Sequence, residues 1–169
     1  MKKLGFDSIS LKDQTDAEKK DIFKNASEIK IMNVSGFDYL NENERYIKTA
    51  LKRGVKVKFL CIYPYSTFLN NIEWLEVGQG FRKDGELISQ EIFDLMSKYA
   101  GTGLEIKFYE TDYRLPIVIV KYHNETKAWL TVTLSSYKST NSFVLRGVSD
   151  GSGDADFVDM MTMHFDTVW

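Results

Sequence analysis

The chain has 169 residues, 43% of them hydrophobic and 14% aromatic, so it is large enough to bury the core of one domain over residues 1–169. Its 22 basic and 24 acidic residues give a net charge of −2, which provides no global attraction for nucleic acid. No stretch approaches the roughly 18 apolar residues of a membrane span, and the N-terminus lacks the apolar segment of a signal peptide. We therefore expect a cytoplasmic protein without a membrane partner.

Helices and strands are expected to alternate in the first part of the chain. A first helix is predicted over 17–26 and a strand over 29–32. A second helix over 37–53 carries an apolar stripe, and Gly54 suits the left-handed position that often ends a helix. The apolar run over 55–62 is typical of a strand that is buried on both faces of a parallel sheet. This order predicts a parallel βαβ unit.

The remainder of the chain is antiparallel in character. A helix over 86–99 and a half-exposed strand over 104–108 come first. Three more strands are expected over 117–122, 127–134 and 143–148. The first two of these are joined by a short polar turn, which predicts a hairpin, and residues 150–154 lead into a terminal helix. The predicted fold is therefore α/β, with a mixed, mostly parallel sheet flanked by helices, C-terminal antiparallel strands and a terminal helix.

Basic side chains gather where the second helix meets the following strand. They are Lys52, Arg53, Lys56 and Lys58. Runs of charge at the ends of helices and strands usually form a solvated surface. We interpret this cluster as such a surface rather than as a binding site.

The segment from Ala17 to Pro64 resembles the opening of a phospholipase D-like domain. The phrase ALKRGVKVKFL is the closest match, and the ending HFDTVW is similar to the C-terminal helix of small bacterial relatives. In that superfamily two copies of the fold pair across a two-fold axis, and a HxKxxxxD motif from each copy builds one phosphodiester-cleaving site. The resemblance therefore implies that this chain is one half of such a site and forms a homodimer.

The catalytic motif of that superfamily is absent where the resemblance would place it. Alignment of the hairpin puts Leu115, Ile117 and Tyr122 at the positions of the motif's His, Lys and Asp. An aliphatic side chain cannot attack phosphorus or neutralise a phosphate, so these residues do not support the chemistry. His123 and Lys127 are near, but they flank the predicted turn instead of sharing one face of a strand. The leading expectation is a domain without catalysis.

The sequence predicts neither a metal nor a cofactor. Two histidines and one cysteine do not form a ligand set with the spacing of a zinc or iron site. The glycine pairs lack the strand and helix context of a nucleotide-binding loop. Cys61 lies within the apolar run FLCIYP, so we expect it to be a buried hydrophobic residue.

Polar side chains follow the ends of the three predicted parallel strands, where ligands of open α/β sheets bind. These strand-end residues are Asn33, Ser35, Tyr63, Tyr65, Tyr109, Thr111 and Arg114. They supply hydroxyls, an amide, aromatic rings and a guanidinium group that binds anions through two hydrogen bonds. The free N–H groups of the helix that follows Gly36 add a place for an anion. We expect this rim to bind a phosphate-bearing small molecule that resembles a nucleotide.

The leading hypothesis is a catalytically inactive phospholipase D-like domain that binds or senses such a ligand in a bacterial regulatory or defence context. The expected partners are a second copy of the chain and the phosphorylated ligand, and nucleic acid is not expected. One alternative is a phosphodiesterase or nuclease with a displaced site at His123 and Lys127. The other is a protein–protein interaction module that uses Met160, Met161 and Met163 on the last helix, because methionine surfaces adapt readily to partners.

Overall fold

The computed structural model describes residues 8–10, 16–33, 37–63, 65–67, 84–110, 116–133, 142–150 and 157–169. The strands are β1 (Ser8–Ser10), β2 (Glu28–Asn33), β3 (Lys56–Ile62), β4 (Leu104–Tyr109), β5 (Ile117–Lys121), β6 (Thr126–Thr133) and β7 (Ser142–Ser149). The helices are α1 (Asp16–Lys24), α2 (Phe37–Glu42), α3 (Glu44–Lys52), α5 (Asp84–Tyr99) and α6 (Phe157–Val168). Within this part of the chain, no helix is long and apolar enough to cross a membrane.

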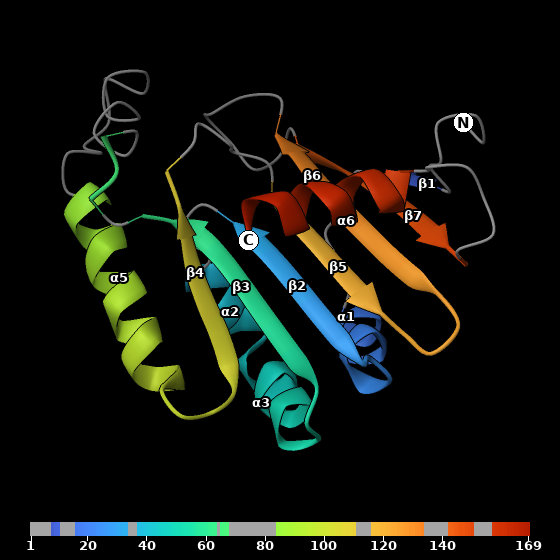
Figure 1. The fold of residues 1–169 in the computed structure, drawn as a ribbon, viewed down its shortest axis with the longest axis horizontal. Helices are drawn as coiled ribbons and strands as arrows, with labels where there is room; N and C mark the ends of the chain where they lie inside the picture. Colours follow the sequence, from blue (N-terminus) through green and yellow to red (C-terminus); the bar gives the residue numbers. More distant parts are fainter. Residues whose placement is uncertain are drawn as a thin grey trace.

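The strands form one seven-stranded sheet in the order β1-β7-β6-β5-β2-β3-β4 (Figure 1). Strands β2, β3 and β4 are parallel, and their register places Asn33 opposite Cys61 and Ile62 opposite Tyr109. The other four pairings among the described strands are antiparallel. The α/β class, the mixed sheet, the C-terminal antiparallel strands and the terminal helix are thereby confirmed. The sheet is not mostly parallel, because only two of its six described pairings are parallel. Strand β1 is not apparent in the sequence pattern, and it adds one of the antiparallel pairings.

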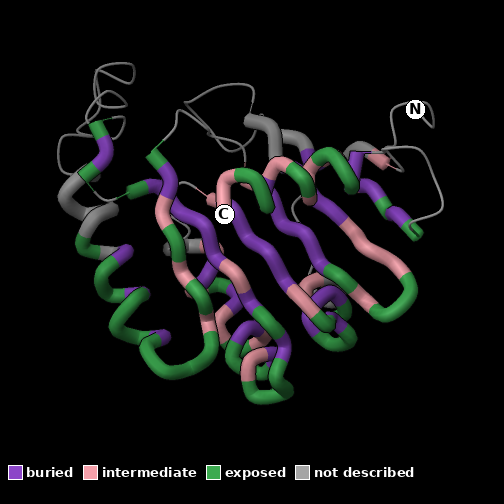
Figure 2. The backbone as a smooth tube through the Cα atoms, in the orientation of Figure 1, coloured by how far each residue is buried: buried purple, intermediate pink, exposed green. Residues whose placement is uncertain are grey.

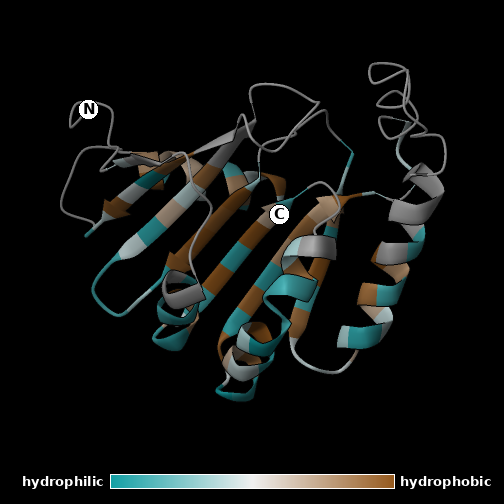
Figure 3. Cartoon of the chain, turned by 180° about the vertical axis from the view of Figure 1, so that it is seen from behind, coloured by the Kyte–Doolittle hydropathy of each residue, from teal (hydrophilic) through white to brown (hydrophobic). Residues whose placement is uncertain are grey.

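Each face of the sheet has its own hydrophobic core. Helices α1, α2, α3 and α5 pack on one face, where Phe59 and Ile31 are fully buried. Helix α6 crosses the opposite face and buries Phe157 and Phe165. The central strands are buried along most of their length because both faces are covered (Figure 2). Seen from behind, the outer sides of α1 and α3 are largely hydrophilic (Figure 3).

The single helix predicted over 37–53 is in fact two helices, α2 and α3, which meet at Asn43. The side chain of Asn43 is fully buried, and its Nδ2 donates a hydrogen bond of 2.7 Å to the carbonyl of Tyr39. Asparagine side chains that bond to the nearby backbone compete with regular helical bonding. At Asn43 the backbone accordingly departs from helical geometry, with φ −104° and ψ 8°.

The end of α3 agrees with the sequence prediction. Gly54 has a φ of +79°, which is the left-handed conformation that glycine adopts without strain. The amides of Arg53 and Gly54 donate to the carbonyls of Ala50 and Leu51 at 3.0 and 2.9 Å. The turn directs the chain straight into β3 and places the Arg53 side chain beside α1.

Candidate functional site

The structure brings together three of the residues predicted at the strand ends. Asn33, Tyr63 and Tyr109 lie at the same edge of the sheet, because β2, β3 and β4 are parallel neighbours. The hydroxyl of Tyr109 lies 3.5 Å from the carbonyl oxygen of Asn33, and the amide of Tyr63 donates to the carbonyl of Tyr109 at 2.8 Å. The other predicted residues beyond the strands, Ser35, Thr111 and Arg114, fall outside the described residues.

The described part of this rim is an aromatic cluster. Tyr63 and Tyr65 are 37% and 68% exposed, and their rings meet edge to face with centroids 5.8 Å apart. Tyr63 also contacts Phe108, and Tyr65 lies against Phe93. Tyr109 is buried, and burial raises the pKa of its hydroxyl, with a smaller contribution from Cys61. The tyrosines thus pack on one another and on neighbouring rings at the ends of β3 and β4.

The residues near the predicted hairpin take structural positions. Ile117 is fully buried in β5, and Leu115 lies outside the described residues. Tyr122 donates a hydrogen bond of 3.2 Å to the carbonyl of Ile22 on α1, and burial raises the pKa of its hydroxyl to about 12.

The two candidates for a displaced catalytic site lie close to the same turn. His123 is exposed between β5 and β6. Lys127 lies on β6, with its ammonium group 2.9 Å from the carboxylate of Glu125 and 5.2 Å from the centroid of the Tyr122 ring. The charge of Lys127 is therefore partly neutralised within the hairpin itself.

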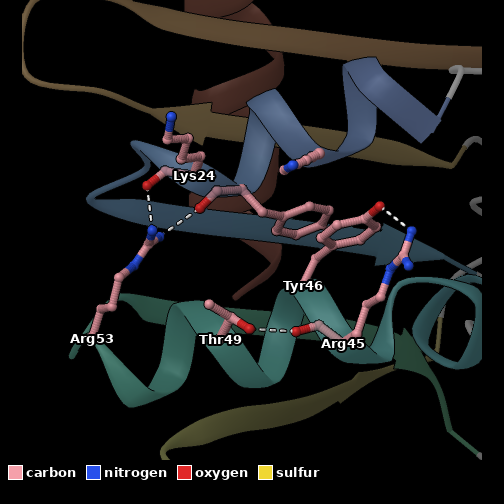
Figure 4. Close-up of a pocket in the computed structure, with 7 residues that line it drawn as sticks. Lys24, Arg45, Tyr46, Thr49 and Arg53 are labelled. Carbon is pink, nitrogen blue, oxygen red and sulfur yellow. Dashed lines mark hydrogen bonds between the residues drawn. The ribbon is translucent and has the colours of Figure 1, made fainter.

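An open cavity of about 580 Å³ lies between α1 and α3, and we call it the α1–α3 groove (Figure 4). The residues that line it are Lys20, Phe23, Lys24, Arg45, Tyr46, Thr49 and Arg53. Four of these seven side chains are cationic and none is acidic. A surface lined by one sign of charge concentrates counter-ions of the opposite sign. The groove is therefore suited to an anionic ligand.

Two aromatic rings that line the groove join α1 to α3. The rings of Phe23 and Tyr46 stack with centroids 5.9 Å apart and an angle of 4° between their planes. The guanidinium of Arg45 lies over the ring of Tyr46, 4.5 Å from its centroid. It also donates a hydrogen bond to the Tyr46 hydroxyl. The stack thus consists of one residue of α1 and two of α3.

Arg53 joins the end of α3 to the end of α1. Its guanidinium donates to the carbonyl of Lys24 and, at 2.5 Å, to the carbonyl of Phe23. The last carbonyls of a helix have no partner within the helix, and the negative end of the helix dipole favours a cation there. Arg53 therefore caps α1 from a position 29 residues further along the chain than Lys24.

The two lysines of the groove differ from its arginines. Lys20 and Lys24 are exposed, and neither makes an ion pair or a side-chain hydrogen bond within the described part of the chain. Lysine carries three rotatable donors on a flexible stem. Their ammonium groups can therefore reach an external ligand without breaking an internal contact.

The sequence shows a basic cluster where α3 meets β3. In the structure its members lie on two different sides of the sheet. Arg53 lies in the α1–α3 groove, whereas Lys58 belongs to the opposite side of the sheet. There Lys58 pairs with Glu28 at 3.3 Å and lies 5.5 Å from the centroid of the Trp169 ring. Lys52, Arg53 and Lys56 are exposed, as the sequence predicted, and Arg53 additionally bonds to two carbonyls of α1. Sequence reasoning missed the groove, whose only local signal was the pair of lysines beside Phe23 on one short helix.

No family model matches the chain, and no curated protein matches it. Among solved structures, the fold is similar to TrmBL2, an archaeal chromatin protein that shows a novel mode of DNA binding. The TM-score is 0.53 and the sequence identity 21%, which together show a shared fold. The match covers 100% of this chain, and this chain spans 54% of the length of TrmBL2.

This comparison corrects two expectations. The prediction that nucleic acid is not a partner is contradicted, because a protein with a similar fold binds DNA. The predicted function, binding or sensing of a phosphate-bearing small molecule, is contradicted by the same finding. The net charge of −2 misleads because it averages over the whole surface, whereas a ligand responds to charges within a Debye length of about 10 Å. The four cations of the α1–α3 groove form such a local field.

Proposed function

We propose that this chain is a nucleic-acid-binding domain whose contact surface is the α1–α3 groove. The observation that carries the proposal is the convergence of four cationic side chains in one groove, whose lining among the described residues contains no carboxylate. Lysine and arginine neutralise phosphates and release condensed counter-ions, which supplies most of the affinity of sequence-independent binding. The similarity of the fold to that of a DNA-binding chromatin protein supports the same class of partner.

The acidic residue on α3 does not oppose this function. The carboxylate of Glu44 accepts hydrogen bonds from Lys48 at 2.5 Å and from Lys98 at 2.9 Å. These two contacts hold the pKa of Glu44 below its ordinary value, so the carboxylate stays ionised and paired. A paired charge contributes little to the field in the groove. Glu44 therefore does not neutralise the four cations that line the groove.

The proposal is tested with two double variants, each of which removes two positive charges from a different side of the sheet. In one variant Lys20→Gln and Lys24→Gln neutralise the groove. In the matched control Lys58→Gln and Lys107→Gln neutralise two lysines that lie near Trp169 on the opposite side. Each variant changes the net charge from −2 to −4, since two charges of +1 are lost.

The affinity of each protein for a fluorescently labelled 20-base-pair DNA duplex is measured by anisotropy at 50 mM salt, with circular dichroism as a check of folding. We expect the groove variant to bind at least about tenfold more weakly than the wild type, and the control to stay within about twofold. Equal losses in both variants would place the contact outside the groove. A wild-type protein that binds no duplex at this salt concentration would overturn the proposed function.

The chain is also proposed to be a phospholipase D-like half that forms a two-fold dimer. The parallel β2-β3-β4 unit followed by an antiparallel β5–β6 hairpin supports this relationship. The dimer stays a prediction that sedimentation equilibrium can check. A monomer at the highest concentration measured would contradict it.

A further inference from the structure

We infer that the lysines and the arginines of the α1–α3 groove have separate roles: Lys20 and Lys24 contact the phosphodiester backbone of duplex DNA, and Arg45 and Arg53 hold the groove in shape. It follows that the groove binds DNA independently of base sequence. The inference rests on the proposed function and deepens it. Four observations carry it.

The first observation is the position of Arg53. Each of its terminal nitrogens donates one hydrogen bond, one to the carbonyl of Lys24 and the other to the carbonyl of Phe23. A guanidinium that caps a helix cannot turn toward a phosphate without leaving those carbonyls unbonded. Because these are the last residues of α1, Arg53 sets where α1 lies relative to α3. Its contribution to DNA binding is therefore the position of Lys20 and Lys24.

The second observation is the stack at the other end of the groove. Arg45 lies over the Tyr46 ring and bonds to the Tyr46 hydroxyl, and Tyr46 in turn stacks on Phe23. The carbonyl of Arg45 also accepts a hydrogen bond of 2.7 Å from Thr49. Cation–π contacts of this kind fix the plane of the guanidinium. Arg45 therefore packs on the Tyr46 ring that stacks against Phe23 of α1.

The third observation is the freedom of the two lysines. Lys20 and Lys24 are four residues apart on α1, so they share one side of the helix. Both are exposed, and neither is paired with another residue among those that the structure describes. Two ammonium groups on one side of a helix can each contact a phosphate of the DNA backbone, where each strand carries one negative charge per about 3.4 Å of helix axis.

The fourth observation is the absence of amide and carboxylate side chains from the described lining of the groove. No asparagine, glutamine, aspartate or glutamate lines the described groove. Base edges are contacted by arginine or lysine at guanine, by asparagine or glutamine at adenine, by carboxylates at cytosine, and by serine or threonine at several bases. The Thr49 hydroxyl of the groove already donates to the carbonyl of Arg45. Here both arginines are held by internal bonds, and lysine is left as the free donor. Lysine contacts to phosphate position a protein on DNA without carrying sequence information.

The salt dependence of binding separates a phosphate contact from a positioning residue. Log Kd is measured against log salt concentration for the wild type and for the single variants Lys20→Gln, Lys24→Gln and Arg53→Gln. For each lysine variant we expect the slope to fall by about 1 relative to wild type. For Arg53→Gln we expect the slope to stay at the wild-type value, while the affinity falls and Tm drops by about 5 °C as the bonds to α1 are lost.

Arg53→Lys is the control that keeps the charge but loses the two-pronged geometry. If Arg53 acts through α1, this variant has the low Tm and the low affinity of Arg53→Gln. If Arg53 instead contacts phosphate, Arg53→Lys binds like the wild type and Arg53→Gln loses about one unit of slope, which would overturn the inference. Folding at the assay temperature is confirmed by circular dichroism, so that the affinities refer to native protein.

Sequence independence is tested with three duplexes of equal length, made only of A·T pairs, only of G·C pairs, or of both. We expect the three affinities to agree within about threefold. A preference of more than about tenfold for one duplex would show base contacts and would overturn the inference, although the proposed function would stand. A wild-type protein that binds none of the three overturns the proposed function, and the inference with it.

Discussion

The ammonium group of Lys30 on β2 lies 2.7 and 2.8 Å from the two carboxylate oxygens of Asp166 on α6, and 136 residues separate these partners in the sequence. Lys30 is only 8% exposed. Its ammonium group also lies 5.8 Å from the centroid of the Phe165 ring. The pair joins the terminal helix to the middle of the sheet and satisfies a charge that the core would otherwise leave without a partner.

Removal of the carboxylate and removal of the ammonium group are expected to change the free energy of unfolding by different amounts. Asp166→Ala leaves a mostly buried ammonium without a counter-charge, so we expect the free energy of unfolding to fall by about 2 kcal/mol. Lys30→Met fills the same space without a charge and should lower it by less than about 1 kcal/mol. Urea unfolding followed by circular dichroism measures both values. Equal losses in the two variants would contradict the buried-charge explanation.

Gly54 is expected to be required for its backbone conformation and not for space. Its φ is +79°, and a Cβ added there would meet no atom within 4 Å. Gly54→Ala should therefore cost about 1 kcal/mol through backbone strain alone. Gly54→Asn should cost less, because asparagine adopts the left-handed conformation more readily. The two midpoints of urea unfolding test this order, and an alanine variant as stable as the wild type would refute it.

High pH should destabilise the folded protein through the Cys61 thiol. Burial raises the pKa of Cys61 from 9.0 to about 12. Between these values the unfolded chain releases a proton that the folded chain keeps, so this contribution is complete below pH 9 and is lost as the pH rises. Burial likewise raises the pKa of Tyr99 and of Tyr122 from 10.0 to about 12, and their effects begin at a higher pH.

The variant Cys61→Ala isolates the thiol. We expect its unfolding free energy to decline less between pH 8.5 and 10 than that of the wild type, by at most about 1.4 kcal/mol per pH unit. Unfolding in urea at four or five pH values gives both curves. Parallel curves would show that the thiol does not titrate differently in the two states.

Low pH should remove a second contribution, which comes from Glu44. Hydrogen bonds from Lys48 and Lys98 hold the pKa of Glu44 below 4.5 in the folded state. The contribution of this carboxylate is therefore present above pH 4.5 and is lost as the pH falls through the lower, folded-state value. Glu44→Gln should show a flatter decline of Tm below pH 4.5 than the wild type.

The control for this prediction is Glu105→Gln on β4. Glu105 is exposed and makes no ion pair with any residue that the structure describes. Its replacement should leave the acid-induced decline of Tm as in the wild type. If both glutamine variants follow the same curve, the bonds from Lys48 and Lys98 do not stabilise the folded state.

Most of the helices and strands could be predicted because each depends on residues that are close in the chain. The apolar run that forms β3 and the glycine that ends α3 are local signals, and both predictions agree with the structure. The break at Asn43 escaped prediction because it depends on a bond from a buried side chain to the carbonyl of Tyr39. Strand β1 has three residues, which is too short for a periodic pattern.

The candidate site was beyond the reach of sequence patterns. The local order of residues was sufficient to specify an α/β domain with a parallel β2-β3-β4 unit, since alternation and apolar stripes reflect the geometry of single strands and helices. The α1–α3 groove depends instead on contacts between distant residues: Phe23 stacks on Tyr46, and Arg53 bonds to carbonyls 29 and 30 residues earlier. Folding therefore placed the lysines of α1 beside the arginines of α3. A positive local field resulted, on a chain whose net charge is −2.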